Sequence, residues 1–290
     1  MEKKCFVALL MVVVMMCACW TGAVADEERK TFTSGDYQYA LLDDGTIEIT
    51  KYNGSAKRLD IPAKLDAKTV TSIGDSAFYL CSSLTSVSIP DSVEQIGTNP
   101  FAVCSALKTI SVSPEHPYFA TIDGVLFRKA DKILIACPAG IKSTTYSIPY
   151  GITTIGDSAF YKCSSLKSVS IPDTVTSIGN DAFYWCSSLT SIAIPDSVTS
   201  IENSAFLSCY SLTSVTIPHS VTSIGDSAFI GCDSLTSIII SDSVTSIGDS
   251  AFSYCPDLTL TVPRNSYAAE YAKTNNIPYT YPDANDWLNN

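Results

Sequence analysis

The segment from Val175 to Ser197 reads VTSIGNDAFYWCSSLTSIAIPDS, and much of the chain repeats it. Near-copies begin at six other positions: Val70, Val93, Ile152, Val198, Val221 and Val244. Consecutive copies are 23 residues apart, except that 59 residues separate the starts at Val93 and Ile152. A fixed period of about 20–29 residues is typical of a solenoid in which successive coils stack on one another.

Each copy places the same residue types at the same positions. The phenylalanine column consists of Phe78, Phe101, Phe160, Phe183, Phe206, Phe229 and Phe252. The cysteine column consists of Cys81, Cys104, Cys163, Cys186, Cys209, Cys232 and Cys255. Because one copy holds too few apolar side chains to fold alone, these columns predict a continuous core that forms only when the coils stack.

The spacing within a copy predicts its local structure. Ser86-Val87-Ser88-Ile89 alternates polar and apolar residues, which predicts a short strand with one buried face that Pro90 ends. Phenylalanine and cysteine three residues apart predict one helical turn, with Asp75-Ser76 as its N-cap. Gly74 and its equivalents are expected in turns with a positive φ, although Glu202 occupies this position in one copy.

The pattern L-x-x-V/I-x-I-P-x-x-V/I-x-x-I-G-x-x-A-F-x-x-C resembles the BspA-like (treponemal-type) leucine-rich repeat family. The resemblance covers nearly all of the chain after residue 40. It implies an α/β repeat solenoid: a right-handed leucine-rich-repeat superhelix with a parallel β-sheet and short helical turns, capped at both ends. It also implies a secreted or surface-bound microbial protein, often an adhesin.

Four regions are predicted along the chain. Residues 1–25 have a basic start, a short apolar run and the cleavage motif Ala23-Val24-Ala25, which is typical of a secretory signal peptide; a lipid anchor at Cys19 is the alternative. Residues 26–69, with a hairpin around Asp44-Gly45, are expected to form an N-terminal cap. The solenoid then covers residues 70–262, with a variant hairpin coil at about 114–151, and residues 263–290 form a C-terminal cap. The protein is therefore expected to be secreted, either free or held at the cell surface, with no membrane span after cleavage.

Composition and motifs argue against several classes of function. The formal net charge of −11 disfavours nucleic acid as a partner, because such binding depends on lysine and arginine at phosphates. No G-x-S-x-G, H-E-x-x-H or phosphate-loop motif is present, and both histidines, His116 and His219, are expected at the surface. We therefore predict no catalytic residues, no cofactor and no enzyme activity.

The cysteines and aspartates do not form metal-binding patterns. No paired C-x-x-C motif follows the predicted signal peptide, so the cysteine column is interpreted as buried free thiols, with disulfides as the alternative. The aspartate columns have no calcium-loop pattern and are interpreted as turn and capping residues. No metal site is predicted.

The two positions after each phenylalanine vary between copies and are often aromatic or apolar. They either form a ligand-binding ridge or pack between coils, and both interpretations remain open. The candidate binding residues are Tyr79, Tyr161, Tyr184, Trp185, Leu207, Ile230 and Tyr254. The sequence thus predicts an extracellular, non-catalytic binding or adhesion protein that recognises a protein, such as host matrix or a cell-surface protein. The alternatives are a glycan-binding surface protein and a structural surface-layer spacer.

Overall fold

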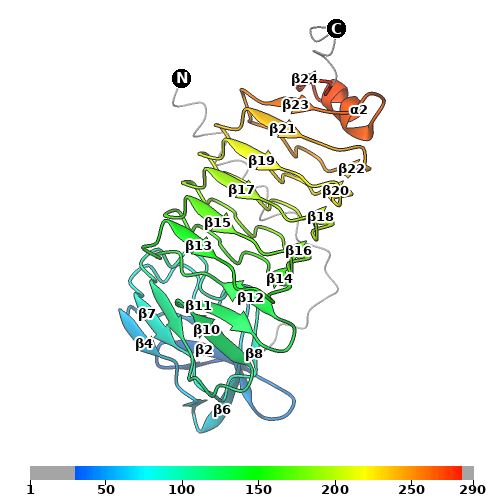
Figure 1. Ribbon diagram of the computed structural model, residues 1–290. Helices are drawn as coiled ribbons and strands as arrows, with labels where there is room; N and C mark the ends of the chain where they lie inside the picture. The colour runs from blue at the N-terminus through cyan, green and yellow to red at the C-terminus, as the bar shows by residue number, and fades with distance from the viewer. Residues whose placement is uncertain (1–29, 283–290) are drawn as a thin grey trace, which may run out of the picture. The chain divides into compact units, whose positions relative to one another are not determined.

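A computed structural model describes residues 30–282 (Figure 1). The predicted signal peptide and Cys19 lie outside the described residues. The description below concerns the compact unit that begins at Phe32. It is a parallel-sheet β-solenoid of about 10 turns with little helix.

Each regular coil contributes one strand to each of two sheets. The first sheet has seven strands: β13 (Thr145–Ser147), β15 (Ser168–Ser170), β17 (Ser191–Ala193), β19 (Ser214–Thr216), β21 (Ser237–Ile239), β23 (Thr259–Thr261) and β24 (Tyr279–Thr280). The second has eight: β10 (Phe119–Ile122), β11 (Val125–Arg128), β12 (Ile133–Ala136), β14 (Thr154–Ile155), β16 (Ser177–Ile178), β18 (Ser200–Ile201), β20 (Ser223–Ile224) and β22 (Ser246–Ile247). Ser191 pairs with Ser168 on one side and Ser214 on the other, so the predicted 23-residue register is confirmed.

The N-terminal coils have sheets of their own. One contains β4 (Arg58–Asp60), β7 (Ser86–Ser88) and β9 (Thr109–Ser111). The other contains β1 (Thr31–Ser34), β2 (Tyr37–Leu41), β3 (Ile47–Tyr52), β5 (Lys64–Leu65), β6 (Lys68–Ile73) and β8 (Gln95–Ile96). Strands β2 and β3 pair antiparallel around the predicted turn, where Gly45 has a φ of 82°. β3 then pairs parallel with β6, which joins the hairpin to the first coil.

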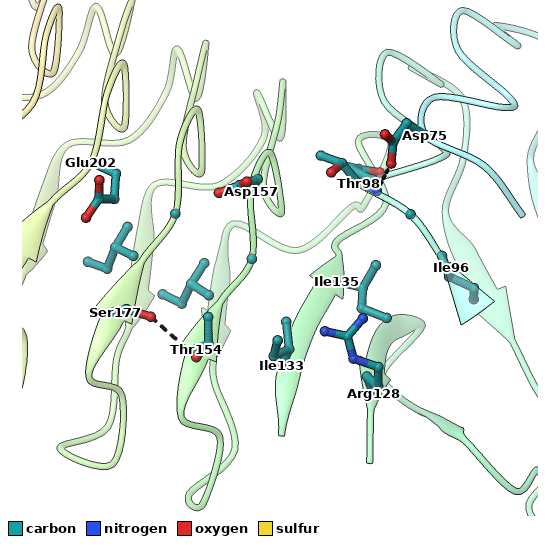
Figure 2. Close-up of a pocket in the computed structure, with 16 residues that line it drawn as sticks. Asp75, Ile96, Thr98, Arg128, Ile133, Ile135, Thr154, Asp157, Ser177 and Glu202 are labelled. Atoms are coloured by element: carbon teal, nitrogen blue, oxygen red, sulfur yellow. Dashed lines mark hydrogen bonds between the residues drawn. The ribbon is translucent and has the colours of Figure 1, made fainter. Parts of the chain in front are cut away.

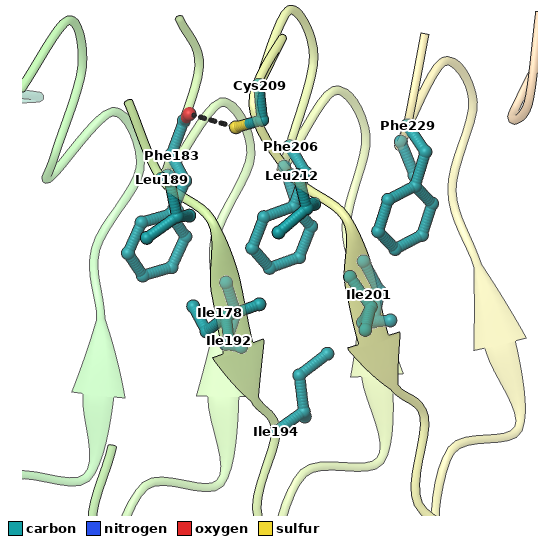
Figure 3. Close-up of a cluster of buried hydrophobic side chains, with 14 of the residues drawn as sticks. Ile178, Phe183, Leu189, Ile192, Ile194, Ile201, Phe206, Cys209, Leu212 and Phe229 are labelled. Atoms are coloured by element: carbon teal, nitrogen blue, oxygen red, sulfur yellow. Dashed lines mark hydrogen bonds between the residues drawn. The ribbon is translucent and has the colours of Figure 1, made fainter. Parts of the chain in front are cut away.

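The phenylalanine column forms a ladder along the core (Figure 3). Phe183 and Phe206 stack with ring centroids 5.2 Å apart and an interplanar angle of 4°, and Phe206 stacks on Phe229 at 5.2 Å and 8°. All three side chains are fully buried. Cys137 takes the phenylalanine position of the variant coil, because the Cys163 thiol contacts its carbonyl oxygen as other thiols contact phenylalanine carbonyls.

The predicted helical turn is instead a pair of tight turns. Asp181 and Trp185 both have left-handed φ values, 54° and 56°, and no helix is assigned anywhere in the repeats of the described region. The backbone N–H of Phe183 donates to Ala205 in the next coil, while that of Tyr184 donates back to Asp181. Hydrogen bonds between coils therefore replace half of those that a helix would make.

Glycine is needed at the position of Gly74 and its equivalents for a different reason from the predicted one. None of the six glycines of this column, Gly74 included, has a positive φ. A Cβ atom added to Gly179 would lie 2.3 Å from Oδ1 of Asp157 in the preceding coil. That Oδ1 atom accepts a hydrogen bond from the backbone N–H of Asn180, 2.7 Å away. The aspartates thus cap the next coil and not their own turn, and glycine is required by close approach.

The predicted hairpin in the variant coil is confirmed, since β11 and β12 pair antiparallel. This hairpin interrupts the second sheet: β12 pairs with β11 and β14, while β8 pairs only with β6. Across this interruption the buried Asn99 donates its side-chain N–H to the carbonyl of Ser158, and its Oδ1 accepts from the N–H of Phe101. We call this junction between the coils of Val93 and Ile152 the seam.

The C-terminal region contains one helix and a final strand. Helix α2 (Tyr267–Thr274) begins after Ser266, whose hydroxyl accepts from the N–H of Ala269. β24 then pairs in parallel with β23. Tyr271 places its hydroxyl 3.2 Å from the carbonyl of Gly248, so the helix contacts the last regular coil.

Candidate functional site

Three of the candidate binding residues come together in one aromatic cluster. The rings of Tyr161 and Tyr184 stack with centroids 4.7 Å apart and an interplanar angle of 2°. Trp185 lies 6.1 Å from Tyr184, and Tyr210 meets Trp185 edge-on at 6.3 Å. The ammonium of Lys162 sits 4.5 Å from the centre of the Trp185 ring, a cation–π contact. We call these five residues the aromatic ridge.

The ridge residues are half-buried. Burial raises the pKa of the Tyr161 and Tyr184 hydroxyls, so both remain protonated donors at neutral pH. Burial also lowers the pKa of Lys162. Beneath them, burial raises the pKa of Asp181 to about 6, with a further contribution from the charge of Asp157. The ridge therefore offers tyrosine hydroxyls, half-exposed rings and the Lys162 ammonium at its surface.

The remaining candidates are dispersed. Leu207 is only 4% exposed, so its predicted role in binding is wrong: it packs inside the stack. Ile230 is half-buried, whereas Tyr79 and Tyr254 are 49% and 65% exposed on other coils. Tyr79 borders a hollow of about 380 Å³ near the N-terminal coils.

Tyr210 is part of the ridge but is not among the sequence candidates. It directly follows Cys209, at a position where four of the other six copies have a serine, such as Ser187. This departure from the repeat is the signal that identifies it.

The seven cysteines of the column are free thiols, and Cys137 is the eighth free cysteine in residues 30–282. Most thiols contact a backbone carbonyl of the preceding coil; Cys209 Sγ lies 3.2 Å from the oxygen of Phe183. Burial raises the pKa of Cys186, Cys209 and Cys232, so these thiols stay protonated and unreactive. Cys81 differs: it is half-buried, and its hydrogen bond with Cys104 lowers its pKa.

The two histidines occupy different environments. His219 is exposed, as expected, but the surface prediction for His116 is wrong, because its side chain is fully buried. Its Nδ1 atom accepts from the backbone N–H groups of Tyr118 and Phe119, each 3.3 Å away. Nε2 therefore carries the proton and donates to the carbonyl of Pro90 at 3.2 Å. These contacts give His116 a structural role inside the variant coil.

A groove of about 490 Å³ lies at the seam (Figure 2). Ile96 and Thr98 line one wall, and Thr154 and Ser177 belong to the strands on the other side. Isoleucines of β12, β14 and β16 form its floor: Ile133, Ile135, Ile155 and Ile178. Three carboxylates stand at the rim, namely Asp75, Asp157 and Glu202. Within residues 30–282, no three histidine, cysteine or acidic side chains are arranged to hold a metal ion.

Comparison with family models identifies the class of protein. The model described as "BspA type Leucine rich repeat region (6 copies)" matches residues 52–138 and 136–259. The chain therefore belongs to the BspA-type leucine-rich repeat family, as the repeat pattern predicts. A search of curated protein sequences finds no match.

Solved structures have the same fold. A leucine-rich cell surface protein from Faecalibacterium prausnitzii A2-165 is 27% identical with a TM-score of 0.58, covering 86% of this chain and 98% of that one. A leucine-rich repeat protein from Eubacterium ventriosum is 21% identical with a TM-score of 0.60, covering 80% and 84%. The pneumococcal vaccine antigen PcpA is 18% identical with a TM-score of 0.54, covering 87% and 97%. The last two support the fold alone.

In the described part of the chain, no helix has the length and apolar character needed to cross a bilayer. Proteins of this repeat class generally act by binding and not by catalysis.

Proposed function

We infer that this protein is an extracellular, non-catalytic binding or adhesion protein that recognises a protein partner through the surface of its repeats. The observation that carries this proposal is the aromatic ridge. The core columns hardly change from coil to coil, yet Tyr161, Tyr184, Trp185 and Tyr210 gather in adjacent coils and remain half-exposed. Tyrosine and tryptophan are enriched at protein interfaces because they combine a large apolar area with a polar tip.

A protein partner fits the ridge better than a glycan does. Sugars stack on free aromatic faces, but Tyr161 and Tyr184 cover each other, and Lys162 lies over Trp185. What the ridge presents is a set of hydroxyl groups and ring edges, which suits a protein surface with backbone acceptors and small apolar side chains. The predicted signal peptide and the cell-surface relative from Faecalibacterium prausnitzii support an extracellular location.

The test is a binding panel of purified extracellular matrix and cell-surface proteins, run beside a glycan array. The ridge variant Tyr184→Leu with Trp185→Ser copies Leu207 and Ser208 of the next coil, so the stack already accepts these residues. Tyr150→Ser, at a tyrosine that is 80% exposed and outside the ridge, is the matched control. We expect the ridge variant to lose binding to its protein partner while the control keeps it. Binding to glycans alone, or equal binding by both variants, would overturn the proposal.

A further inference from the structure

The seam leaves one strand of the solenoid with an open edge. In a regular coil the strand is paired on both sides; the carbonyl of Ile155, for example, accepts from Gly179 at 2.9 Å. The carbonyl of Ile73 likewise accepts from Gly97 in the coil of β8. β8 itself pairs only with β6, and no strand of the described region pairs with its other side. Unpaired backbone groups of this kind are a template for a further strand.

The open edge of β8 borders the groove and not flat solvent. Figure 2 shows Ile96 of β8 on one side and Ile133 and Ile135 of β12 on the other, with the side chain of Arg128 between them. Among the floor residues Ile133 is half-buried and supplies accessible apolar surface, whereas Ile135, Ile155 and Ile178 are almost fully buried. An extended backbone laid along β8 would therefore place alternate side chains over isoleucine, since side chains of a strand alternate between its two faces.

The charge at the rim of the groove determines which charge a bound segment should carry. Asp75 Oδ1 accepts from the N–H of Thr98 at 2.6 Å, and Asp157 Oδ1 accepts from that of Asn180 at 2.7 Å. Glu202 Oε1 accepts from the hydroxyl of Ser200 at 2.6 Å. Each carboxylate is thus held in place by one oxygen, and its second oxygen makes no hydrogen bond within residues 30–282.

The one cation at the groove is already neutralised. Arg128 donates to both oxygens of Asp131, at 2.8 to 3.0 Å. No lysine or arginine of the described region forms an ion pair with Asp75, Asp157 or Glu202. The groove is therefore acidic at its rim and apolar at its floor.

We propose that the open edge of β8 accepts an extended segment of a partner protein as an added strand, with aliphatic side chains on the isoleucine floor and lysine or arginine at the acidic rim. The proposal specifies which part of the protein partner is bound, an extended segment, and so rests on the proposed function. Addition of a strand to an exposed edge is a general mode of peptide recognition, in which backbone hydrogen bonds supply affinity and alternate side chains supply specificity. Because β8 is only two residues long, charge pairing at the rim must add to the few backbone bonds.

The test uses the purified full chain and three fluorescent, end-blocked pentapeptides, measured by anisotropy at low and high salt. The first peptide has the sequence lysine-valine-threonine-valine-lysine. The second replaces both lysines with glutamate, and the third is the lysine peptide N-methylated at its central backbone nitrogens. We expect the lysine peptide to bind at least about tenfold more tightly than the glutamate peptide, and this preference to shrink at high salt. N-methylation is expected to weaken binding by about fivefold or more, because it removes backbone donors.

Protein variants locate the site. The triple variant Asp75→Asn, Asp157→Asn and Glu202→Gln removes three charges but keeps every acceptor oxygen, and Asn203 already serves as such an acceptor two coils beyond Asp157. Asp226→Asn, in the same column but outside the groove, is the matched control. We expect the triple variant to lose the preference for lysine and the control to keep it. No binding of the lysine peptide at about 1 mM, equal binding of all three peptides, or equal behaviour of the two variants would overturn the proposal.

This outcome is separable from that of the proposed function. The ridge variant Tyr184→Leu with Trp185→Ser should bind the lysine peptide as the wild type does. A chain that binds partner proteins through its ridge but ignores all three peptides would retain the proposed function and lose the β8 site. A chain that binds the lysine peptide but no protein on the panel would retain the β8 site and lose the proposed function.

Discussion

The Oδ1 atom of Asp157 accepts a 2.7 Å hydrogen bond from the backbone N–H of Asn180, and so ties one coil to the next. The same relationship joins Asp226 to Asp249, at 2.8 Å. It brings the carboxylate under the glycine of the following coil, since a Cβ atom on Gly248 would lie 2.3 Å from Oδ1 of Asp226. The side-chain cap therefore requires the glycine, because the capping carboxylate occupies the space that a Cβ atom would need.

The first prediction follows from this device. Gly179→Ala should lower the free energy of unfolding by about 1–3 kcal/mol, because the new methyl group meets both Oδ1 and the backbone nitrogen of Asp157. Urea unfolding followed by circular dichroism measures the change. Glu202→Ala is the control, since the fold already accommodates a side chain at that equivalent position. A Gly179→Ala protein as stable as the control would show that the close contact relaxes without cost.

Much of the fold is predictable from the sequence because the residues that make each contact between coils recur in several copies of the repeat. The phenylalanine column predicts the Phe183–Phe206 ladder, and alternation predicts the strands of the first sheet. The strands of the second sheet, such as β16, are only two residues long and too short for alternation to be recognised. The helical turn is mispredicted because hydrogen bonds to a neighbouring coil compete with those inside the turn, and local spacing carries no information about that competition.

The site is less predictable for a related reason. Variation between copies selects Tyr161, Tyr184 and Trp185, which lie together in the structure, but it also selects Leu207, which has the same position in its copy as Tyr184 and is buried. Exposure depends on the neighbouring coils, where each side chain meets a different residue. The groove depends on a hairpin that breaks the sheet, and no residue pattern encodes a strand edge that is left unpaired.

A second prediction concerns the seam. Asn99→Ala should lower the free energy of unfolding by about 1–3 kcal/mol, because it leaves the buried N–H of Phe101 without an acceptor and removes the bond from Asn99 to the carbonyl of Ser158, which keeps its bond from Tyr161. Hydrogen exchange should show faster exchange on both sides of the seam. Asn180→Ala is the control, since its only side-chain hydrogen bond is exposed and 3.4 Å long. Loss of protection spread evenly along all coils would contradict a local role for Asn99.

A third prediction concerns thiol reactivity. In the native protein Cys81 should react first with a thiol reagent, because it is half-buried and has a lowered pKa, whereas burial raises the pKa of Cys255 to about 11. Timed alkylation with peptide mass spectrometry measures each cysteine separately. Cys81→Ser should remove the fast phase and Cys255→Ser should leave it. After unfolding, all eight cysteines of residues 30–282 should be labelled; any that resists labelling until a reductant is added would reveal a disulfide.

The last prediction is a pH dependence that originates at His116. Burial lowers its pKa in the folded state, aided by the charge of Lys129 and opposed by that of Asp91. A depressed pKa means that the unfolded chain binds the proton more readily, so the contribution of His116 to stability is complete above a pH of about 6.5 and is lost as pH falls below it. Urea unfolding at a series of pH values should therefore show a loss between neutral and acidic pH that is smaller in His116→Asn. His219→Gln, at an exposed histidine, is the control. An equal loss in the wild type and in His116→Asn would assign the acid sensitivity to the carboxylates instead.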